Sequence, residues 1–467
     1  MHSWHPGTRT PDRAAIVALD KRHVWHPYTP MKRYVEEVDP FVIAHASGPF
    51  LHDVDGRRYF DANSSWWVAA LGHGHPRLVE ALVEQARSMC HVSLAGTTHA
   101  PAAELAKALV DVAPAGLERV FYSDDGSTAL EAALKMALGY HAHRGEPGRS
   151  RFVALGGAFH GETLGVVALG GVPLFRRAYA GALMEAYFCE PPPLDEAEGG
   201  PSYLAVEQLV RERAAELAGI VVEPLLQGAT GMRLHAPAFL RHLRKLADEH
   251  GLLLIADEVF TGYGRTGTMW AIEQAGVRPD LLCTAKGFSG GILPMAATLA
   301  SDAVYQAFYD APEKTFFHGH SFCGNPLGAR VALEVLAVMR DEGVLEGIAE
   351  RSARIRASFE RMGAHAATTK PRAIGMVGAI DLVDPRSQEA AEEPSEGDED
   401  EKVPWSERPG YLGQAGWRVH EAARERGVYL RPLGDVVYVA PPLNIGLDEL
   451  DELLGLVEES LRVALEG

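Results

Sequence analysis

Two polar residues of this chain each follow a short apolar run, and their side chains are suited to nucleophilic and acid–base chemistry. The run at residues 252–256 leads to Asp257, and the run at residues 281–285 leads to Lys286. A lysine amine forms an imine with an aldehyde, and a carboxylate keeps a pyridine nitrogen protonated so that the ring accepts electrons. An acid and an amine at the ends of two apolar strands are therefore typical of an enzyme that uses pyridoxal 5'-phosphate.

A polar turn at residues 124–128 (Asp-Asp-Gly-Ser-Thr) lies between an expected strand and an expected helix. Backbone N–H groups and the positive end of the helix dipole would meet in such a turn, which suits a phosphate group. The alternative is an ordinary helix cap formed by Ser127 or Thr128. Because the turn accompanies the acid and the amine in one chain, we interpret it as a phosphate site.

A glycine-rich segment at residues 156–161 (Gly-Gly-Ala-Phe-His-Gly) follows another expected strand. The face of Phe159 could stack on a planar ring bound at that strand end. An ordinary turn with Phe159 in the core fits the same residues equally well, so the segment alone leaves both interpretations open.

The segment at residues 262–267 (Gly-Tyr-Gly-Arg-Thr-Gly) matches the G-x-G-x-x-G pattern of a dinucleotide-binding turn. Residues 257–261 separate it from the preceding strand, and no acidic residue stands about twenty positions further on, where a ribose partner is expected. We therefore interpret the segment as an ordered glycine-rich loop and not as an NAD site.

The sequence His-Gly-His occurs twice, at residues 73–75 and 318–320. Histidines two positions apart, without an accompanying set of carboxylates or cysteines, make a poor zinc signature, so we expect no metal site. The central glycines indicate tight turns instead. Ser321 follows the second motif and could donate to a phosphate.

The elements that must position these residues follow a regular pattern. Between about residues 100 and 300, apolar runs alternate with helical patterns, which predicts a mostly parallel sheet covered by helices on both faces. Long helices and a few short strands follow, which predicts a smaller C-terminal α/β domain. The expected strands are residues 119–122, 151–155, 220–222, 252–256, 281–284 and 295–300, and the expected helices are residues 129–140, 239–250, 327–339, 345–362 and 447–465.

We expect three parts in the chain. Residues 1–72 would pack with the small domain or with a partner subunit, residues 73–330 would form the large domain, and residues 331–467 the small one. Residues 387–402 carry many acidic groups and almost no large apolar side chains. Such a segment cannot bury enough surface to offset its ordering entropy, so we expect a disordered surface insertion.

Composition narrows the class of protein. The 467 residues can bury a large core, and the net charge of −19 argues against a nucleic-acid or anionic-membrane surface. The four cysteines show no disulfide spacing, and the N-terminus lacks the apolar core of a signal peptide. No apolar run is long enough to span a bilayer. We therefore expect a soluble cytoplasmic protein that acts on small molecules.

Four further motifs narrow the class of enzyme. They are Trp25-His26-Pro27-Tyr28-Thr29, Ser64-Ser65-Trp66-Trp67, His318-Gly319-His320-Ser321-Phe322 and Leu430-Arg431-Pro432-Leu433-Gly434. With the residues above, they resemble a class III (ω-type) aminotransferase, a fold-type I pyridoxal-phosphate enzyme, from about Val24 to the last helix. Within that class they are most similar to the adenosylmethionine–8-amino-7-oxononanoate aminotransferases of biotin synthesis, which make 7,8-diaminononanoate.

The resemblance implies a role for each matching residue. Lys286 would carry the cofactor and shuttle the proton, and Asp257 would pair with the pyridinium nitrogen. The other implied cofactor contacts are Gly126, Ser127, Phe159, Val259, His320 and Ser321, of which Ser321 would reach across from the other subunit of a homodimer. The implied substrate contacts are Tyr28, Trp66, Trp67, Phe159, Lys286, Gly319, Arg431 and Tyr438, with Arg431 on the substrate carboxylate.

Four positions depart from the pattern of these enzymes. Phe159 stands where they usually have tyrosine, His320-Ser321 where they have Pro-Thr, and Glu162 where they have aspartate. The His-Gly-His-Ser form also occurs in relatives that use L-lysine as the amino donor. Trp66 and Tyr438 favour S-adenosylmethionine instead, because those relatives tend to lack both. The donor stays open between the two, with S-adenosylmethionine favoured.

Three other functions fit parts of the pattern. A class III transaminase with an ω-amino acid–pyruvate or diamine specificity would use the same chemistry on another substrate. A glutamate-1-semialdehyde aminomutase would need no external keto acid, but the tryptophan pair and the Tyr28 motif argue against it. A cofactor-binding regulator would have lost a chemical group, whereas Lys286, Asp257 and Arg431 are all present.

Overall fold

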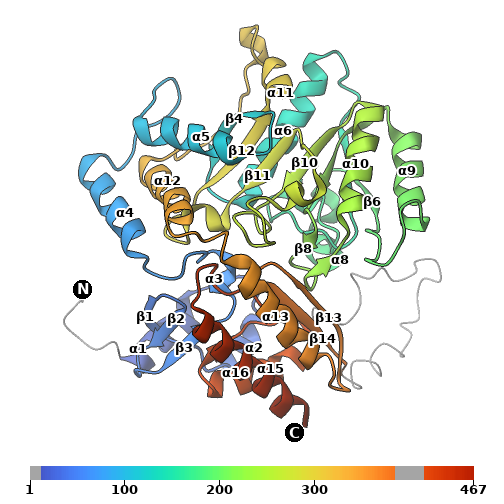
Figure 1. Cartoon of the computed structure of the whole chain (residues 1–467). Coiled ribbons are helices and arrows are strands. Elements are labelled where there is room, and N and C mark those ends of the chain that lie inside the picture. The colour runs from blue at the N-terminus through green and yellow to red at the C-terminus, as the bar shows by residue number, and fades with distance from the viewer. Residues whose placement is uncertain (1–11, 384–414, 467) are drawn as a thin grey trace.

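The computed structural model describes residues 12–383 and 415–466, and the expected acidic insertion at residues 387–402 lies outside them. Figure 1 shows a large unit, and below it a smaller unit to which both ends of the described chain contribute. Over the described ranges, no helix is long and apolar enough to cross a membrane.

A seven-stranded sheet forms the centre of the large unit. Its order is β4 (Leu117–Ser123), β12 (Ala296–Ser301), β11 (Leu281–Thr284), β10 (Leu253–Asp257), β7 (Leu217–Val222), β5 (Arg151–Leu155) and β6 (Tyr187–Cys189). Only β12 runs antiparallel to its neighbours. Every residue of β7, β10 and β11 is buried, as expected for strands covered on both faces. The predicted mostly parallel sheet is confirmed.

Helices cover both faces of this sheet, and the side chains of β10 show the division. Leu253 and Ile255 pack in the core formed with α6, whereas Leu254 and Ala256 pack in the larger core on the other face. This alternation follows from the period of two in a strand. The principal helix on the first face is α6 (Gly126–His143). The helices on the second face are α5 (Ala100–Val112), α9 (Pro201–Arg213), α10 (Pro237–His250) and α12 (Pro326–Asp341), and α4 (Pro76–Ser88) packs against α12.

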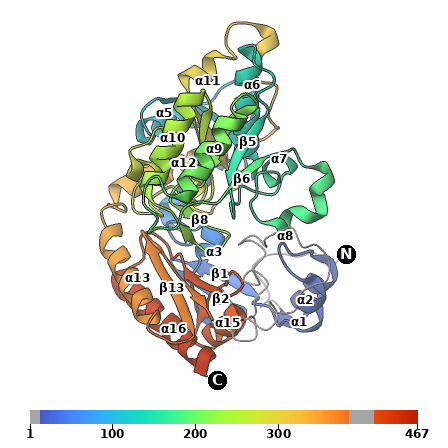
Figure 2. The same cartoon turned by 90° about the vertical axis from the view of Figure 1, so that its right-hand side faces the viewer.

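The smaller unit combines the N-terminal and C-terminal parts of the chain (Figure 2). Its first sheet holds β1 (Ile43–Ser47), β2 (Phe50–Asp53), β3 (Arg58–Asp61) and β15 (Val428–Tyr429), and its second holds β13 (Thr368–Ile374), β14 (Val377–Leu382) and β16 (Val436–Val439). Its helices are α1 (Arg13–His23), α2 (Met31–Glu36), α13 (Ile348–Met362), α15 (Ala415–Glu425) and α16 (Leu447–Glu466). The parallel pairing of β15 with β3 joins the two chain ends. The exact boundaries of the three expected parts stay a prediction.

Short elements complete the fold. They are α3 (Ser64–Trp67), α7 (Leu164–Val167), α8 (Pro173–Arg176), α11 (Asp302–Gln306), β8 (Leu226–Gln227), β9 (Arg233–Leu234) and the 3₁₀ helices η1 (Arg177–Ala182), η2 (Ala271–Ala275), η3 (Lys286–Ser289) and η4 (Pro312–Lys314). The element that matters most for the site is α3, because its backbone is left-handed.

Candidate active site

A cavity of about 560 Å³ lies at the carboxyl ends of the large sheet. Residues that directly follow β4, β7, β10 and β11, or end them, line its wall, as expected for a ligand site of an open α/β sheet. Of the residues predicted from sequence, the cavity brings together Tyr28, Trp66, Trp67, Gly126, Ser127, Phe159, Asp257, Val259 and Lys286. The residues predicted at the ends of different strands therefore lie together in one cavity.

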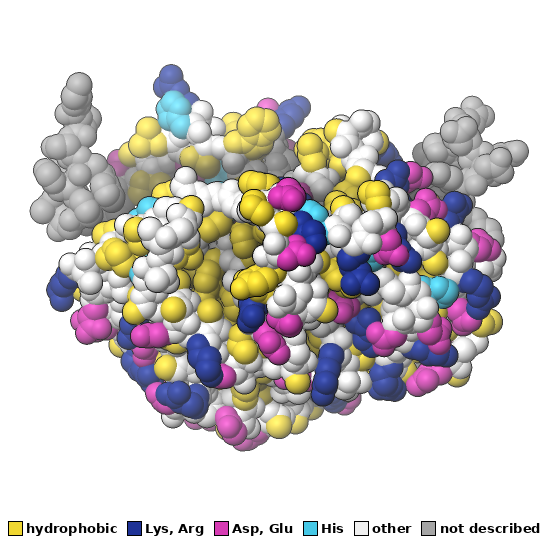
Figure 3. Space-filling view, turned by 90° about the horizontal axis from the view of Figure 1, so that it is seen from above, with side chains coloured by type: hydrophobic (Ala, Val, Ile, Leu, Met, Phe, Trp, Pro, Cys, Tyr) yellow, Lys and Arg dark blue, Asp and Glu magenta, His cyan; other side chains and the backbone are white. Residues whose placement is uncertain are grey.

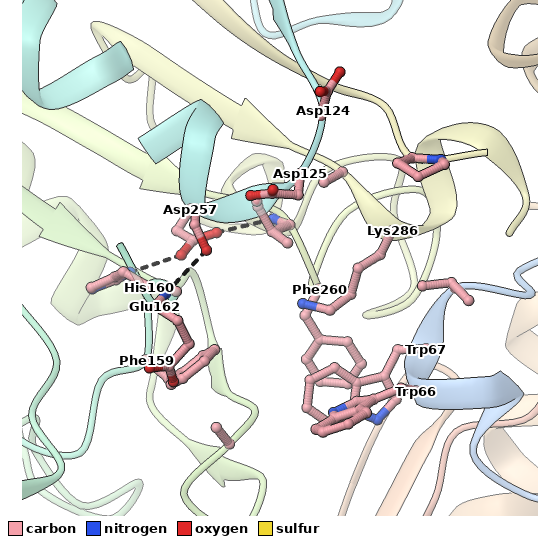
Figure 4. A pocket seen from close by; sticks show the side chains of 18 of the residues that line it. Trp66, Trp67, Asp124, Asp125, Phe159, His160, Glu162, Asp257, Phe260 and Lys286 are labelled. Carbon is pink, nitrogen blue, oxygen red and sulfur yellow. Dashed lines mark hydrogen bonds and ion pairs between the residues drawn. The ribbon is translucent and has the colours of Figure 1, made fainter. Parts of the chain in front are cut away.

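Lys286 points into the open space between the Asp257 side of the cavity and the tryptophan pair (Figure 4). Its Nζ lies 5.0 Å from the centre of the Trp67 ring. Burial lowers the pKa of the Lys286 amine, while the charges of Asp257 and Glu223 partly oppose that shift. A lowered pKa increases the share of the neutral amine, which is the nucleophilic form.

Asp257 is buried at the end of β10, and both of its carboxylate oxygens are held. Oδ2 lies 2.7 Å from Nδ1 of His160, and Oδ1 accepts a hydrogen bond of 3.1 Å from the backbone N–H of Val259. Burial by itself lowers the pKa of His160, but the hydrogen bond to Asp257 and the charges of Asp257 and Glu223 outweigh it, so the pKa is raised. The Asp257 carboxylate therefore stabilises the protonated ring of His160.

Sequence reasoning missed the roles of His160 and Glu223. Glu223 directly follows β7, is buried, and accepts backbone hydrogen bonds of 2.9 Å from Phe159 and 3.0 Å from Gly228. Burial raises the pKa of Glu223 to about 7, and the charge of His160 limits the rise. The signal that could have found both residues was present: each directly follows, or lies in a turn after, an expected strand.

His235 packs beside this group and gives a prediction about stability. Its Nε2 lies 2.9 Å from the backbone oxygen of Glu223, and burial lowers its pKa from 6.5 to about 4. Because the folded-state pKa is depressed, the neutral ring contributes its full stability above pH 6.5. Between pH 6.5 and about 4, the unfolded chain takes up a proton that the folded chain refuses, so stability falls by up to about 3 kcal/mol.

We expect His235→Gln to flatten this acid limb, because glutamine keeps a donor for the Glu223 carbonyl but does not titrate. The measurement is urea unfolding of both proteins at several pH values between 4 and 7. The difference in unfolding free energy between the two proteins reports His235 alone. Glu223 and Glu258 contribute equally to both proteins, and their raised pKa values make stability rise as the pH falls. Parallel stability curves for the two proteins would contradict the assignment.

The turn before α6 has the form of an anion site. Asp125 is the N-cap residue, with Thr128 as its reciprocal partner in a capping box, so neither Ser127 nor Thr128 is the cap that the alternative interpretation assumed. The helix consequently begins at Gly126 rather than near residue 129. The Asp125 carboxylate accepts the backbone N–H of Thr128. The N–H groups of Gly126 and Ser127, two residues of the cavity wall, are left without an acceptor inside the helix.

Close packing explains the two glycines around this turn. A Cβ atom at Gly126 would lie 2.7 Å from Cγ1 of Val259, and one at Gly161 would lie 2.2 Å from Oγ of Ser127. The hydroxyl of Ser127 also accepts a hydrogen bond of 3.1 Å from the backbone N–H of Glu162. The loop after β5 is therefore packed directly onto the turn before α6.

The tryptophan pair sits on a left-handed turn. Ser64, Ser65, Trp66 and Trp67 have φ angles of 47°, 46°, 67° and 73°, and none of them is glycine. Such a conformation costs about 1–2 kcal/mol per residue, so surrounding contacts must hold it. The turn presents both indoles to the cavity, with the Trp67 ring 4.1 Å from the ring of Phe260.

Two predicted substrate residues lie behind these indoles and not on the cavity wall. The guanidinium of Arg431 lies 5.0 Å from the Trp66 ring and 5.9 Å from the Trp417 ring. The hydroxyl of Tyr438 accepts a hydrogen bond of 3.2 Å from Nε1 of Trp67. Tyr438 thus supports Trp67, and a contact of Arg431 with a substrate carboxylate stays a prediction.

Tyr28 and Glu162 meet at another part of the rim. The Tyr28 hydroxyl donates to the Glu162 carboxylate, and the Tyr28 ring lies 5.4 Å from the Trp66 ring and 5.7 Å from the Phe175 ring. Burial raises the pKa of Glu162, and the hydrogen bond from Tyr28 opposes the rise. This contact connects the N-terminal segment to the large unit across the cavity.

The two His-Gly-His motifs form pairs with other elements. His73 lies 2.8 Å from Asp61, and His75 lies 3.2 Å from Glu342. In the second motif, His318 lies 3.1 Å from Lys135, and His320 lies 3.5 Å from Asp124. Among the described residues, no group of three or more metal-ligating side chains occurs.

Three residues of the second motif lie outside the cavity of the single chain. Gly319, His320 and Ser321 are absent from its wall, although Asp124, the neighbour of His320, belongs to it. A contact of these residues with the cofactor or substrate therefore stays a prediction.

The Gly262–Gly267 loop packs against the smaller unit. Arg265 is buried and donates a hydrogen bond of 2.6 Å to the backbone oxygen of Pro441, and a Cβ at Gly264 would lie 2.7 Å from Leu345. The glycines thus allow close packing between the two units, as an ordered loop requires.

The chain is similar in sequence and in fold to known aminotransferases. The family model "Aminotransferase class-III" matches residues 33–461. The adenosylmethionine-8-amino-7-oxononanoate aminotransferase of Nitratidesulfovibrio vulgaris is 41% identical over 97% of this chain and 82% of the relative. The crystal structure of the aminotransferase of the same name from Methanocaldococcus jannaschii is 32% identical, with a TM-score of 0.88 over 97% of this chain and 99% of that one. An (S)-enantioselective ω-transaminase from Thermomicrobium roseum is 28% identical, with a TM-score of 0.87 over 98% and 100%.

Proposed function

The chain belongs to the class III aminotransferase family, and on this premise we propose that it transfers an amino group from S-adenosylmethionine to 8-amino-7-oxononanoate. The product is 7,8-diaminononanoate, an intermediate of biotin synthesis. Relatives that match nearly the whole chain carry this activity in their names. The observation that carries the proposal is a cavity with an amine and a carboxylate on one side, and aromatic walls backed by an arginine on the other.

The proposed cofactor is pyridoxal 5'-phosphate, and the residues present fit its polar groups. Asp257 offers a buried carboxylate for the ring nitrogen, and the first turn of α6 offers N–H groups for the phosphate. A side chain at Gly126 would collide with Val259, so glycine lets this turn pack directly on a residue that also lines the cavity. When bound, this cofactor supplies an aldehyde for an amine and a ring that accepts electrons from the reacting carbon.

The residues of the chain supply positioning and proton transfer. The Lys286 amine, with its lowered pKa, would hold the cofactor covalently and carry the proton between the reacting carbons. Asp257, fixed by His160 and Val259, would keep the ring nitrogen protonated. Phe159 and Val259 line the cavity and would pack against the ring.

The opposite wall suits a long keto acid. Trp66, Tyr28 and Phe175 present apolar ring surface for a methylene chain, and Phe159 adds an apolar face without a hydroxyl. Arg431 would bind the far carboxylate through its guanidinium. The hydrogen bond from Trp67 to Tyr438 would fix the shape of the pocket.

We expect the chain to act as a homodimer. The N-terminal helices α1 and α2 contain no buried residue, and Trp25 and Phe317 are 89% and 78% exposed. Figure 3 also shows apolar side chains gathered around a hollow on one face of the molecule. Exposed apolar surface of this kind is typical of an interface. A second subunit would bring Gly319, His320 and Ser321 to the neighbouring cavity.

The donor is tested by following one half-reaction by absorbance. Holoenzyme is mixed separately with S-adenosylmethionine and with L-lysine, while the cofactor band near ~420 nm is followed as it converts to the amine form near ~330 nm. We expect S-adenosylmethionine to convert the band and 8-amino-7-oxononanoate to restore it.

Each other outcome has a defined meaning. Conversion by L-lysine alone would keep the product but change the donor. Conversion by neither compound would favour another class III specificity, such as that of an ω-amino acid–pyruvate transaminase.

A further inference from the structure

Asn63 is a buried residue to which the proposed function gives no role. Its side chain is 1% exposed and lies directly before the left-handed turn that carries the tryptophan pair. Nδ2 donates a hydrogen bond of 3.2 Å to the backbone oxygen of Tyr438, and Oδ1 accepts one of 2.6 Å from the backbone N–H of Arg431. One amide side chain thus contacts two segments that are more than 360 residues away in sequence.

These two contacts hold the loop that carries the arginine at both of its ends. Arg431 begins the loop and Tyr438 lies in β16 beyond it, while Leu433 between them lines the cavity. Within the loop, Leu433 and Val436 exchange backbone hydrogen bonds, and Asp435 accepts from the backbone N–H groups of Leu382 and Ala415. Asn63 is therefore the side chain that ties both ends of the loop to the N-terminal segment, beside the backbone hydrogen bonds of Ala62 with Tyr429 and Ala440.

The same residue also starts the left-handed turn. The backbone oxygen of Asn63 accepts a hydrogen bond of 2.8 Å from the N–H of Trp67. The hydroxyl of Ser64 donates to the backbone oxygen of Ala440 at 2.8 Å, and that of Ser65 donates to the buried carboxylate of Asp61 at 2.7 Å. Polar contacts at three successive residues hold a conformation that non-glycine residues disfavour.

We infer that Asn63 is a positioning residue that fixes Arg431 relative to the tryptophan wall, and through that wall relative to Lys286 on the amine side of the cavity. It thereby selects the chain length of the keto acid whose carboxylate Arg431 binds. The inference rests on the proposed function, because it assigns a selectivity to that substrate site.

The geometry gives the reason for such a role. A keto acid held at its ketone by the amine side of the cavity meets Arg431 only when the spacing matches its number of methylene groups. The Arg431 guanidinium is held beside Trp66 and donates to the backbone oxygen of Tyr28 at 3.3 Å, so it has little freedom to follow a shorter or longer chain. A misplacement of about 1 Å in such a site reduces turnover by about a hundredfold.

The test compares Asn63→Ala with the wild-type holoenzyme. We expect the KM for 8-amino-7-oxononanoate to rise about tenfold, and the preference over homologues with one methylene fewer or one more to fall by a similar factor. The donor half-reaction should change less than about twofold, because the donor need not use Arg431. Asn63→Asp keeps the acceptor for the Arg431 N–H but loses the donor to the Tyr438 oxygen. Its KM and its chain-length preference should therefore lie between those of the wild type and those of Asn63→Ala.

Asn444→Ala is the matched control. The Asn444 amide also joins distant parts of the chain, donating to the backbone oxygen of Leu71 at 3.3 Å, but it does not line the cavity. It should lower thermal stability without changing the chain-length preference. The inference is overturned if Asn63→Ala keeps the wild-type preference, or if it only slows both half-reactions equally, as a general loss of structure would.

The test distinguishes this inference from the proposed function. If the wild-type enzyme does not convert 8-amino-7-oxononanoate, the proposed function fails. The same chain-length comparison is then made with the series of terminal keto acids that the wild-type enzyme does accept. A preference that Asn63→Ala leaves unchanged in that series overturns the inference as well.

Discussion

Replacing Lys286 with alanine abolishes transamination, with an expected loss of about 10⁴-fold or more in kcat. Lys286 is the only lysine that lines the cavity among the described residues, so no neighbouring amine can take over its two tasks. The variant should still bind the cofactor, because Asp257 and the first turn of α6 are unchanged. The measurement combines steady-state turnover with mass spectrometry of the borohydride-treated protein, in which wild type keeps the cofactor on Lys286 and the variant does not.

Two controls give this result its meaning. Lys107→Ala removes an exposed lysine that pairs with Asp111 on α5, and it should leave turnover unchanged. A small primary amine added to Lys286→Ala should restore part of the turnover, because the missing group is an amine and not a piece of the fold. Turnover of Lys286→Ala close to that of the wild type would show that another residue carries the cofactor.

The sheet could be predicted because its strands are buried on both faces. The runs at residues 151–155 and 281–284 coincide with β5 and β11. Strand β6 was missed, because its three residues form an edge that is only partly buried. The start of α6 was placed three residues late. The residues between Asp125 and Thr128, which form the capping box, are small or polar and so do not show the apolar spacing that indicates a helix.

The centre of the site could be predicted because the carboxyl ends of parallel strands meet at one edge. Asp257 and Lys286 end or follow neighbouring strands, so their proximity follows from topology. His160 and Glu223 follow strands of the same sheet, but their partners are set by contacts between residues such as His160 and Asp257 that are 97 positions apart. No local pattern encodes that pairing.

The left-handed turn could not be predicted at all. Ser64 to Trp67 contain no glycine, and glycine is the usual signal for a positive φ. The conformation depends on hydrogen bonds to Tyr438, Arg431 and Ala440, more than 360 residues away. For the same reason, sequence placed Arg431 and Tyr438 among the substrate contacts without showing that they lie behind the tryptophans.

Asp257→Asn should produce the second-largest effect. Asparagine has nearly the same volume and can still accept the hydrogen bond from Val259, but it carries no charge to hold the ring nitrogen protonated. Removing one preorganised electrostatic partner costs about a hundred- to a thousandfold in kcat, which corresponds to about 3–4 kcal/mol. The measurement is the single-turnover rate of the cofactor colour change after mixing with the donor.

Asp257→Asn also leaves His160 without its carboxylate partner. The raised pKa of His160 depends on that hydrogen bond and on the nearby charges, and so it should fall in the variant. His160→Gln alone should therefore slow the reaction less than Asp257→Asn does. The double variant should be no slower than Asp257→Asn, because both residues act through one group.

Glu258→Gln is the control for burial of a carboxylate. Glu258 is the next residue in the chain, is equally buried, and accepts hydrogen bonds from Thr261, Ala271 and Ile272 instead of facing the cavity. Its glutamine variant should lose thermal stability, because an amide group then faces backbone donors, while the single-turnover rate stays within about twofold. If both variants lower the single-turnover rate equally, Asp257 acts only through packing. If Asp257→Asn alone lowers it, the rate depends on the charge of Asp257.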